Sequence, residues 1–122
     1  STYIEVEMKK FILAFKFAFS GLFNAIKKER NMKIHLLAVI VVFIMGYLYK
    51  ISNVEWMICI VLFGLVISSE LINTGIEQTV NLVTEEKNPI AKYAKDVSAG
   101  AVLVNAIVSA IIAGIIWIPK IF

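Results

Sequence analysis

The sequence contains one cysteine, two prolines and no glycine-rich phosphate-binding loop. Cys59 has no partner for an internal disulfide, and its place in an apolar run indicates ordinary packing. Without a Walker or kinase glycine loop, the common soluble nucleotide-binding motifs are excluded. Charged residues make up only 17% of the 122 positions, hydrophobic residues make up 60%, and the mean hydropathy is +0.85. This composition excludes an ordinary soluble domain and predicts one integral-membrane domain over residues 1–122.

The charged residues that are present give a net charge of +3 and are unevenly distributed. Seven of the twelve Lys and Arg residues precede residue 34, three lie between residues 84 and 96, and only Lys50 and Lys120 lie elsewhere. Because the basic residues flank apolar segments, anionic lipid headgroups suit them better than nucleic acid. The positive-inside rule predicts a multi-pass plasma-membrane protein with its N-terminus in the cytoplasm and its C-terminus outside.

Residues 4–28 have the pattern of an amphipathic helix that lies on the membrane surface. Apolar residues recur at spacings of three and four, and lysines occupy the opposite side. The apolar positions are Ile4, Met8, Phe11, Ile12, Phe15, Phe19, Leu22, Phe23 and Ile26. The same periodicity would place Glu29 beside Phe11 and Leu22 on the buried stripe. A frayed helix end, with Glu29 in water beside Arg30, fits the sequence equally well.

Three apolar segments are long enough to cross a bilayer as helices, which predicts an all-α membrane protein with three spans and the surface helix. The predicted spans are residues 33–50, 53–83 and 89–118. Ser52 and Glu55 have the spacing of a capping box at the start of the second span. Asn88 and Pro89 have the order of an N-cap followed by proline in the first turn. Pro119 is expected to end the third span.

A polar stripe interrupts the second span. Glu70, Asn73, Glu77 and Asn81 fall within an arc of roughly 80° on a helix. A carboxylate within an apolar helix costs on the order of 3 kcal/mol, and two on one face repel unless a cation joins them. A polar seam between helices would explain the two amides. The two acids favour an ion or phosphate site near the cytosolic interface.

The residues around this stripe are suited to phosphoryl transfer. Lys95 and Asp96 face the stripe across a short turn, and Glu29 supplies a third acid. Carboxylate oxygens could hold Mg²⁺, a lysine could neutralise phosphate, and a carboxylate could take a proton from an acceptor hydroxyl. His35 could be a general base, although a lone histidine at a helix entrance is more often an interfacial hydrogen-bonding residue. A small multidrug transporter or a membrane scaffold is the alternative, but the acids lie near the interface rather than at midspan.

The segment from Glu70 to Glu77, Glu-Leu-Ile-Asn-Thr-Gly-Ile-Glu, resembles the signature of the small prokaryotic integral-membrane lipid kinases, the diacylglycerol and undecaprenol kinases. Ser20-Gly21-Leu22, Ala94-Lys95-Asp96 and residues 99–103 extend the resemblance over nearly the whole chain. The resemblance implies a homotrimer in which neighbouring subunits share the active sites. It also implies ATP as co-substrate, Mg²⁺ as the metal and a membrane lipid alcohol as the acceptor.

Functional roles follow from this resemblance position by position. Glu70 resembles the catalytic base, Asn73 resembles a supporting amide, and Glu29 and Glu77 resemble the metal ligands. The positions that resemble nucleotide contacts are Lys10, Phe17, Glu86, Lys95 and Asp96. Phe17 has an aromatic ring but lacks the hydroxyl group often found at that position.

Two further segments bear on the substrate and on the match to the family. Residues 29–35 resemble the Gram-positive branch, whose members phosphorylate undecaprenol, the lipid carrier of cell-wall synthesis. Diacylglycerol, which would yield phosphatidic acid, is the alternative acceptor. Asn81 departs from the family pattern, which usually has aspartate there. The sequence therefore resembles an ATP- and Mg²⁺-dependent polyprenol kinase.

Overall fold

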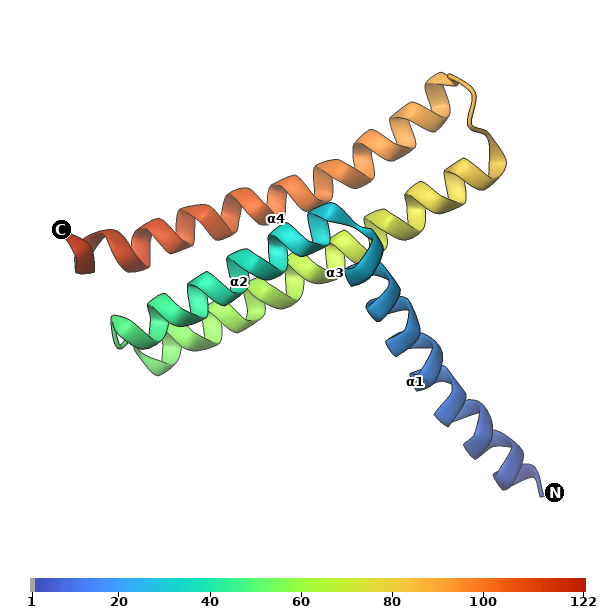
Figure 1. Ribbon diagram of the computed structural model, residues 1–122, viewed down its shortest axis with the longest axis horizontal. Helices are drawn as coiled ribbons and strands as arrows, with labels where there is room; N and C mark the ends of the chain where they lie inside the picture. The colour runs from blue at the N-terminus through green and yellow to red at the C-terminus, as the bar shows by residue number, and fades with distance from the viewer. Residues whose placement is uncertain (1) are drawn as a thin grey trace.

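The computed structural model describes residues 2–122, and this range contains helices and no strands. The helices are α1 (Tyr3–Lys28), α2 (Arg30–Leu48), α3 (Asn53–Val83) and α4 (Pro89–Ile121). Helix α3 packs against both α2 and α4. Helix α1 meets this bundle at its own C-terminal end, where it contacts α2 and α3, and the rest of α1 projects away from the bundle (Figure 1). The prediction of an all-helical chain is confirmed.

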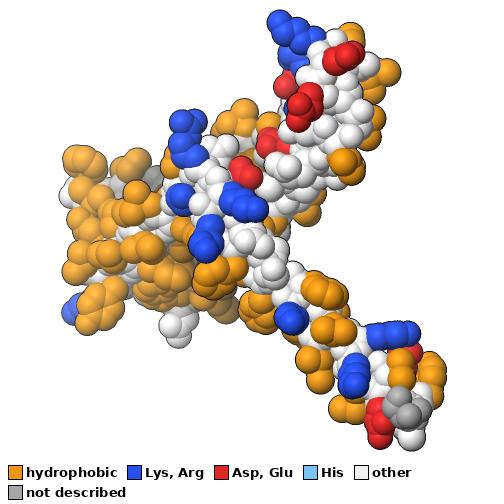
Figure 2. Space-filling model, turned by 45° about the vertical axis from the view of Figure 1, so that its right-hand side comes forward, with side chains coloured by type: hydrophobic (Ala, Val, Ile, Leu, Met, Phe, Trp, Pro, Cys, Tyr) orange, Lys and Arg blue, Asp and Glu red, His pale blue; other side chains and the backbone are white. Residues whose placement is uncertain are grey.

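The three bundle helices are long and apolar enough to cross a membrane. In the most apolar windows of α2, α3 and α4, only 11%, 22% and 17% of the residues are buried within the chain. Figure 2 shows apolar side chains over much of the visible bundle surface and basic side chains where α1 leaves the bundle. An apolar surface of this extent requires lipid or another protein chain to cover it.

The helix ends at the turns follow the expected chemistry. The hydroxyl of Ser52 accepts a hydrogen bond from the backbone N–H of Glu55, and the Glu55 carboxylate accepts one from the backbone N–H of Ser52. The side chain of Asn88 accepts hydrogen bonds from the first backbone N–H groups of α4. Lys50, in the turn between α2 and α3, has a positive φ of 50°. Helix α2 therefore ends at Leu48, two residues before the end of the predicted span.

The expectation that Pro119 ends the last helix is not met. Helix α4 continues to Ile121, and the backbone N–H of Phe122 still donates to the carbonyl of Ile118. Proline removes its own N–H donor and crowds the preceding turn, but it does not prevent the next residues from bonding in the helical pattern. One lost hydrogen bond in a final turn is therefore tolerated.

The best-packed part of the bundle lies near the turn between α2 and α3. Ile51, Cys59, Ile116 and Trp117 form a buried cluster that joins this turn to α3 and α4. Beside the cluster, the indole ring of Trp56 lies so close to Gly46 that a Cβ atom there would be 2.7 Å from the ring. The absence of a side chain at Gly46 is what lets α2 approach α3 here.

We therefore expect Gly46→Ala to destabilise the protein in detergent. The new methyl group would meet a rigid indole ring, and overpacking of this kind costs about 1–3 kcal/mol. Gly114→Ala is the matched control, because its Cβ would lie at an ordinary 3.6 Å from Ile118. Both substitutions gain the same helix preference of alanine over glycine. The difference between their free energies of unfolding isolates the steric cost, and equal values would contradict the prediction.

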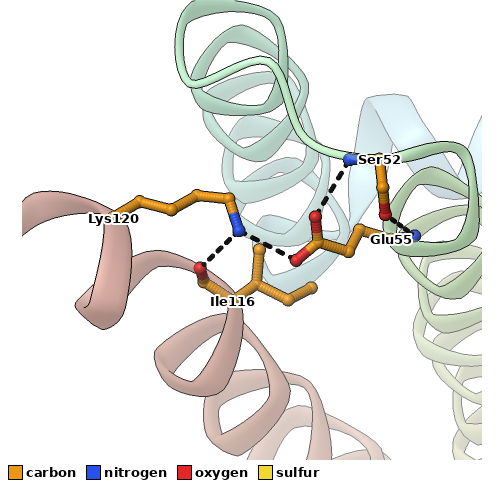
Figure 3. A network of polar contacts seen from close by, with 4 residues as sticks. All are labelled: Ser52, Glu55, Ile116 and Lys120. Atoms are coloured by element: carbon orange, nitrogen blue, oxygen red, sulfur yellow. Dashed lines mark hydrogen bonds and ion pairs between the residues drawn. The ribbon is translucent and has the colours of Figure 1, made fainter.

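Polar contacts tie α3 to α4 along their length. Near the C-terminal end of α4, Nζ of Lys120 donates to Oε2 of Glu55 at 2.9 Å and to the carbonyl of Ile116 at 3.1 Å (Figure 3). Farther along, the side-chain amide of Asn105 donates to the carbonyl of Leu65 at 3.2 Å. Glu55 therefore both caps α3 and binds α4 (Figure 3).

Candidate active site

The polar stripe on α3 enters the protein interior at Glu70. Glu70 is 2% exposed and Asn73 is buried, whereas Glu77 and Asn81 are half-buried. The helix positions these side chains on one face because their spacings of three and four residues match its period. The stripe therefore begins as a buried carboxylate and becomes more accessible along α3.

A short hydrogen-bond chain fixes the middle of the stripe. The hydroxyl of Ser98 on α4 donates to Oδ1 of Asn73 at 2.7 Å, with the carbonyl of Lys95 also within 3.0 Å of the hydroxyl. The amide nitrogen of Asn73 then donates to Oε1 of Glu77 at 3.1 Å. Because an ionised carboxylate can only accept hydrogen bonds, the amide nitrogen of Asn73 is the atom that faces Glu77. Asn73 thereby orients the Glu77 carboxylate.

Glu70 has a different neighbour. Nε2 of His35 on α2 lies 3.5 Å from Oε2 of Glu70. This is an ion-pair distance without hydrogen-bond geometry, and in residues 2–122 Oε2 has no hydrogen-bond partner. Burying such an oxygen costs about 1–3 kcal/mol. A buried oxygen without a partner needs an explanation, such as a catalytic role or a bound ion.

A pocket of about 290 Å³ opens beside these side chains, between α2, α3 and α4. Its polar lining comes from Asn31, His35, Glu70 and Asn73. An apolar cavity of about 270 Å³ adjoins it, and His35 lines both spaces. A molecule with a polar head and an apolar chain would match this pair of spaces.

The predicted nucleotide residues of α4 and the preceding loop lie together. Glu86, Lys95 and Asp96 line an open hollow of about 640 Å³ formed by residues 84–89 and the first turns of α4. Asp96 pairs with Lys92 one turn earlier on the same helix. The hollow therefore presents both signs of charge on its surface.

The predicted residues of α1 lie elsewhere. Nζ of Lys10 lies 3.5 Å from Oε1 of Glu7 on the same helix, and Phe17 is 66% exposed. Both belong to the part of α1 that projects from the bundle (Figure 1). One copy of the chain therefore does not bring Lys10 and Phe17 to the hollow that contains Glu86, Lys95 and Asp96.

Glu29 occupies the corner between α1 and α2. Its extended backbone (φ −96°, ψ 119°) interrupts the helix, while its N–H still donates to the carbonyl of Ala25. Its side chain is half-buried, and within the described chain it makes no capping hydrogen bond to α2. The residue therefore lies neither on a continued stripe of α1 nor at a frayed end.

The carboxylates suit Mg²⁺ by their chemistry. Mg²⁺ in phosphoryl-transfer sites binds one or two carboxylates together with substrate phosphates and water. Glu77 is held through Oε1 by Asn73, which orients the group. No three His, Cys, Asp or Glu side chains gather into a metal cluster anywhere in residues 2–122. A metal here would therefore depend on the phosphates of a substrate for its remaining ligands.

Comparison with known proteins identifies the family. The model of the family described as prokaryotic diacylglycerol kinase matches residues 16–117, which is well over half of the chain. The chain belongs to this family. The resemblance seen in the segment from Glu70 to Glu77 is thus confirmed.

Individual members of the family differ in their named substrate. An undecaprenol kinase of Bacillus subtilis is 44% identical over 114 residues, which cover 93% of each chain. A diacylglycerol kinase of Synechocystis is 32% identical over 109 residues, 88% of this chain and 62% of that protein. A diacylglycerol kinase of Pseudomonas aeruginosa is 29% identical over 94 residues, 77% of this chain and 76% of that protein.

Two side chains in this family member were not assigned to the site from the sequence. Ser98 was not singled out as a site residue, because nothing in the neighbouring sequence signals that its hydroxyl reaches Asn73. For His35 the sequence left a general base open, with an interfacial hydrogen-bonding residue as the more usual alternative. A signal for His35 does exist, because His35 and Glu70 lie at similar distances along the chain from the turn at Ile51. In an antiparallel hairpin such residues come together.

Proposed function

We propose that this lipid kinase family member transfers the γ-phosphoryl group of ATP to undecaprenol. The observation that carries the proposal is the buried carboxylate of Glu70, which lies with other polar side chains in a pocket directly beside an apolar cavity. A lipid alcohol has the matching division into a hydroxyl group and an apolar chain. The preference for undecaprenol is supported by the 44% identity to the undecaprenol kinase of Bacillus subtilis.

In the proposed reaction the lipid hydroxyl oxygen attacks the γ-phosphorus of ATP. A new O–P bond forms, the bond between that phosphorus and the ADP oxygen breaks, and the hydroxyl proton passes to Glu70. Asn73 holds Glu77 in place through the hydrogen bond between them. Mg²⁺, held by Glu77 and Glu29, would neutralise negative charge on the phosphates.

The nucleotide is proposed to bind in the hollow at Glu86, Lys95 and Asp96, with Lys10 and Phe17 supplied by α1. Because one copy does not bring these two sets together, we assign them to neighbouring copies in a homotrimer with shared active sites. The small buried fraction of each apolar helix supports an assembly.

In the membrane, α1 is proposed to lie at the cytosolic surface as an amphipathic helix with its lysines near anionic headgroups. The N-terminus and the active site would then be cytoplasmic, and the C-terminus would be outside. The grouping of basic side chains where α1 meets the bundle supports this orientation (Figure 2).

Radiolabelled phosphate transfer in mixed micelles tests the substrate. With ATP and Mg²⁺ supplied, we expect undecaprenol to be phosphorylated with a higher kcat/KM than diacylglycerol. Equal or faster turnover of diacylglycerol would reject undecaprenol as the substrate and leave the kinase activity standing. If neither alcohol accepted phosphate, the lipid kinase proposal itself would fail.

A further inference from the structure

The contact between His35 and Glu70 has no role in the reaction described so far. His35 is the single histidine of the sequence, and its Nε2 lies 3.5 Å from Oε2 of Glu70. The same oxygen lacks any hydrogen-bond partner within residues 2–122. In unliganded sites catalytic hydrogen bonds are often long and tighten when the substrate binds.

The proposed chemistry leaves Glu70 with a proton that it must lose. After each transfer its side chain is a carboxylic acid, and only 3% of that side chain is exposed. The other polar groups of the pocket are the amides of Asn31 and Asn73, which donate and accept hydrogen bonds but are not bases. The pocket residues from α4 are Ala99, Val102, Leu103 and Ala106, none of which titrates. An acceptor other than these groups is therefore needed.

We propose that His35 is the positioning residue that holds the Glu70 carboxylate and passes its proton to water. This inference rests on the proposed role of Glu70 as the base. The neutral imidazole accepts the proton of the Glu70 acid at Nε2, which gives a carboxylate and an imidazolium. The imidazolium then releases a proton to water, and no other reactant is consumed. The His35 side chain is 20% exposed and the Glu70 side chain 3%, so His35 lies nearer the surface of the chain than Glu70.

Three variants of the full chain, assayed in undecaprenol micelles, test this role. His35→Gln keeps a side-chain donor near Glu70 but cannot relay a proton. We expect its kcat to fall by at least about tenfold, less than the loss of a base that touches the reacting atom. The KM for ATP should change by less than about twofold, because His35 does not line the hollow proposed for the nucleotide. Added imidazole should restore part of the kcat of His35→Ala and none of the kcat of Glu70→Gln.

A second measurement detects the contact without relying on activity. With only one histidine in the chain, ¹⁵N-histidine labelling gives a single imidazole to observe by NMR in micelles. Its Nε2 resonance should shift in Glu70→Gln and stay in place in Leu37→Ala, which changes an exposed apolar residue of the same helix. An unchanged resonance in Glu70→Gln would overturn the proposed contact.

The outcomes separate this inference from the function on which it rests. An active wild type with a His35→Gln kcat within twofold of it would overturn the role of His35 alone. The same conclusion follows if His35→Ala loses kcat, is not rescued by imidazole and has a lowered unfolding midpoint. His35 would then be only structural. A wild type that transfers no phosphate would reject the lipid kinase proposal first. If His35→Ala does not fold, the kcat of His35→Gln and the imidazole resonance in Glu70→Gln still test the role of His35.

Discussion

Glu70→Gln is expected to lower kcat for phosphoryl transfer by about 10²–10⁴-fold, the usual contribution of a positioned general base. Glutamine has the shape of glutamate but its amide cannot accept the lipid proton. Glu70 is buried beside His35 and away from the loop hollow, so the substitution should leave the nucleotide subsite intact. Radiolabel transfer measures kcat, and equilibrium binding of Mg²⁺-ATP measures affinity on the same protein.

Turnover and nucleotide affinity, measured on the same variant, distinguish a catalytic base at Glu70 from a metal ligand. Retained nucleotide affinity with lost turnover is the signature of a missing base. Lost affinity with residual turnover would instead make Glu70 a metal ligand. Glu70→Asp is the matched control, because it keeps a carboxylate but withdraws it by one methylene group. Its turnover should fall between those of the wild type and the glutamine variant.

Glu77→Gln should have the second-largest effect, and on binding rather than on chemistry. The substitution replaces a charged oxygen ligand by a neutral amide while the helix and the neighbouring Asn73 remain. Loss of even a second-shell partner costs metal sites about 10–100-fold in affinity, so loss of a direct ligand should cost at least tenfold. Titration of Mg²⁺ in the presence of a non-hydrolysable ATP analogue measures the change.

Glu55→Gln provides the charge-matched control for this experiment. It removes one negative charge from the same helix at its opposite end, where Glu55 binds Lys120. We expect its Mg²⁺ affinity to match that of the wild type, even if the unfolding midpoint changes. Equal affinities for wild type, Glu77→Gln and Glu55→Gln would remove Glu77 from the metal site.

Much of the fold could be predicted from the sequence because its signals are local. A capping box at Ser52 and an Asn-Pro start at Asn88 define two helix starts by chemistry within four residues. The C-terminal end of α4 could not be predicted in this way. Whether the helix continues past Pro119 depends on whether the residues after it form helical hydrogen bonds. The presence of a proline alone does not decide this.

The candidate site was predictable to the extent that it lies on one helix. Glu70, Asn73 and Glu77 share a face of α3, so periodicity alone groups them. His35 and Ser98 come from α2 and α4, and their approach depends on how far each helix slides along α3. Glu29 shows the limit of periodicity, because one extended residue ends α1 and removes the position from its stripe. Backbone breaks of a single residue leave no periodic signal.

The polar contacts between α3 and α4 also determine where the chain can change length. Glu55 with Lys120, Leu65 with Asn105, and Asn73 with Ser98 meet in antiparallel order along the two helices. One residue inserted between Leu65 and Asn73 would rotate everything beyond it by about 100° and advance it by about 1.5 Å. At least one of these contacts would then be lost. Insertions and deletions are compatible with the fold in the loop 84–88, and an alignment of this chain with its relatives should place its gaps there.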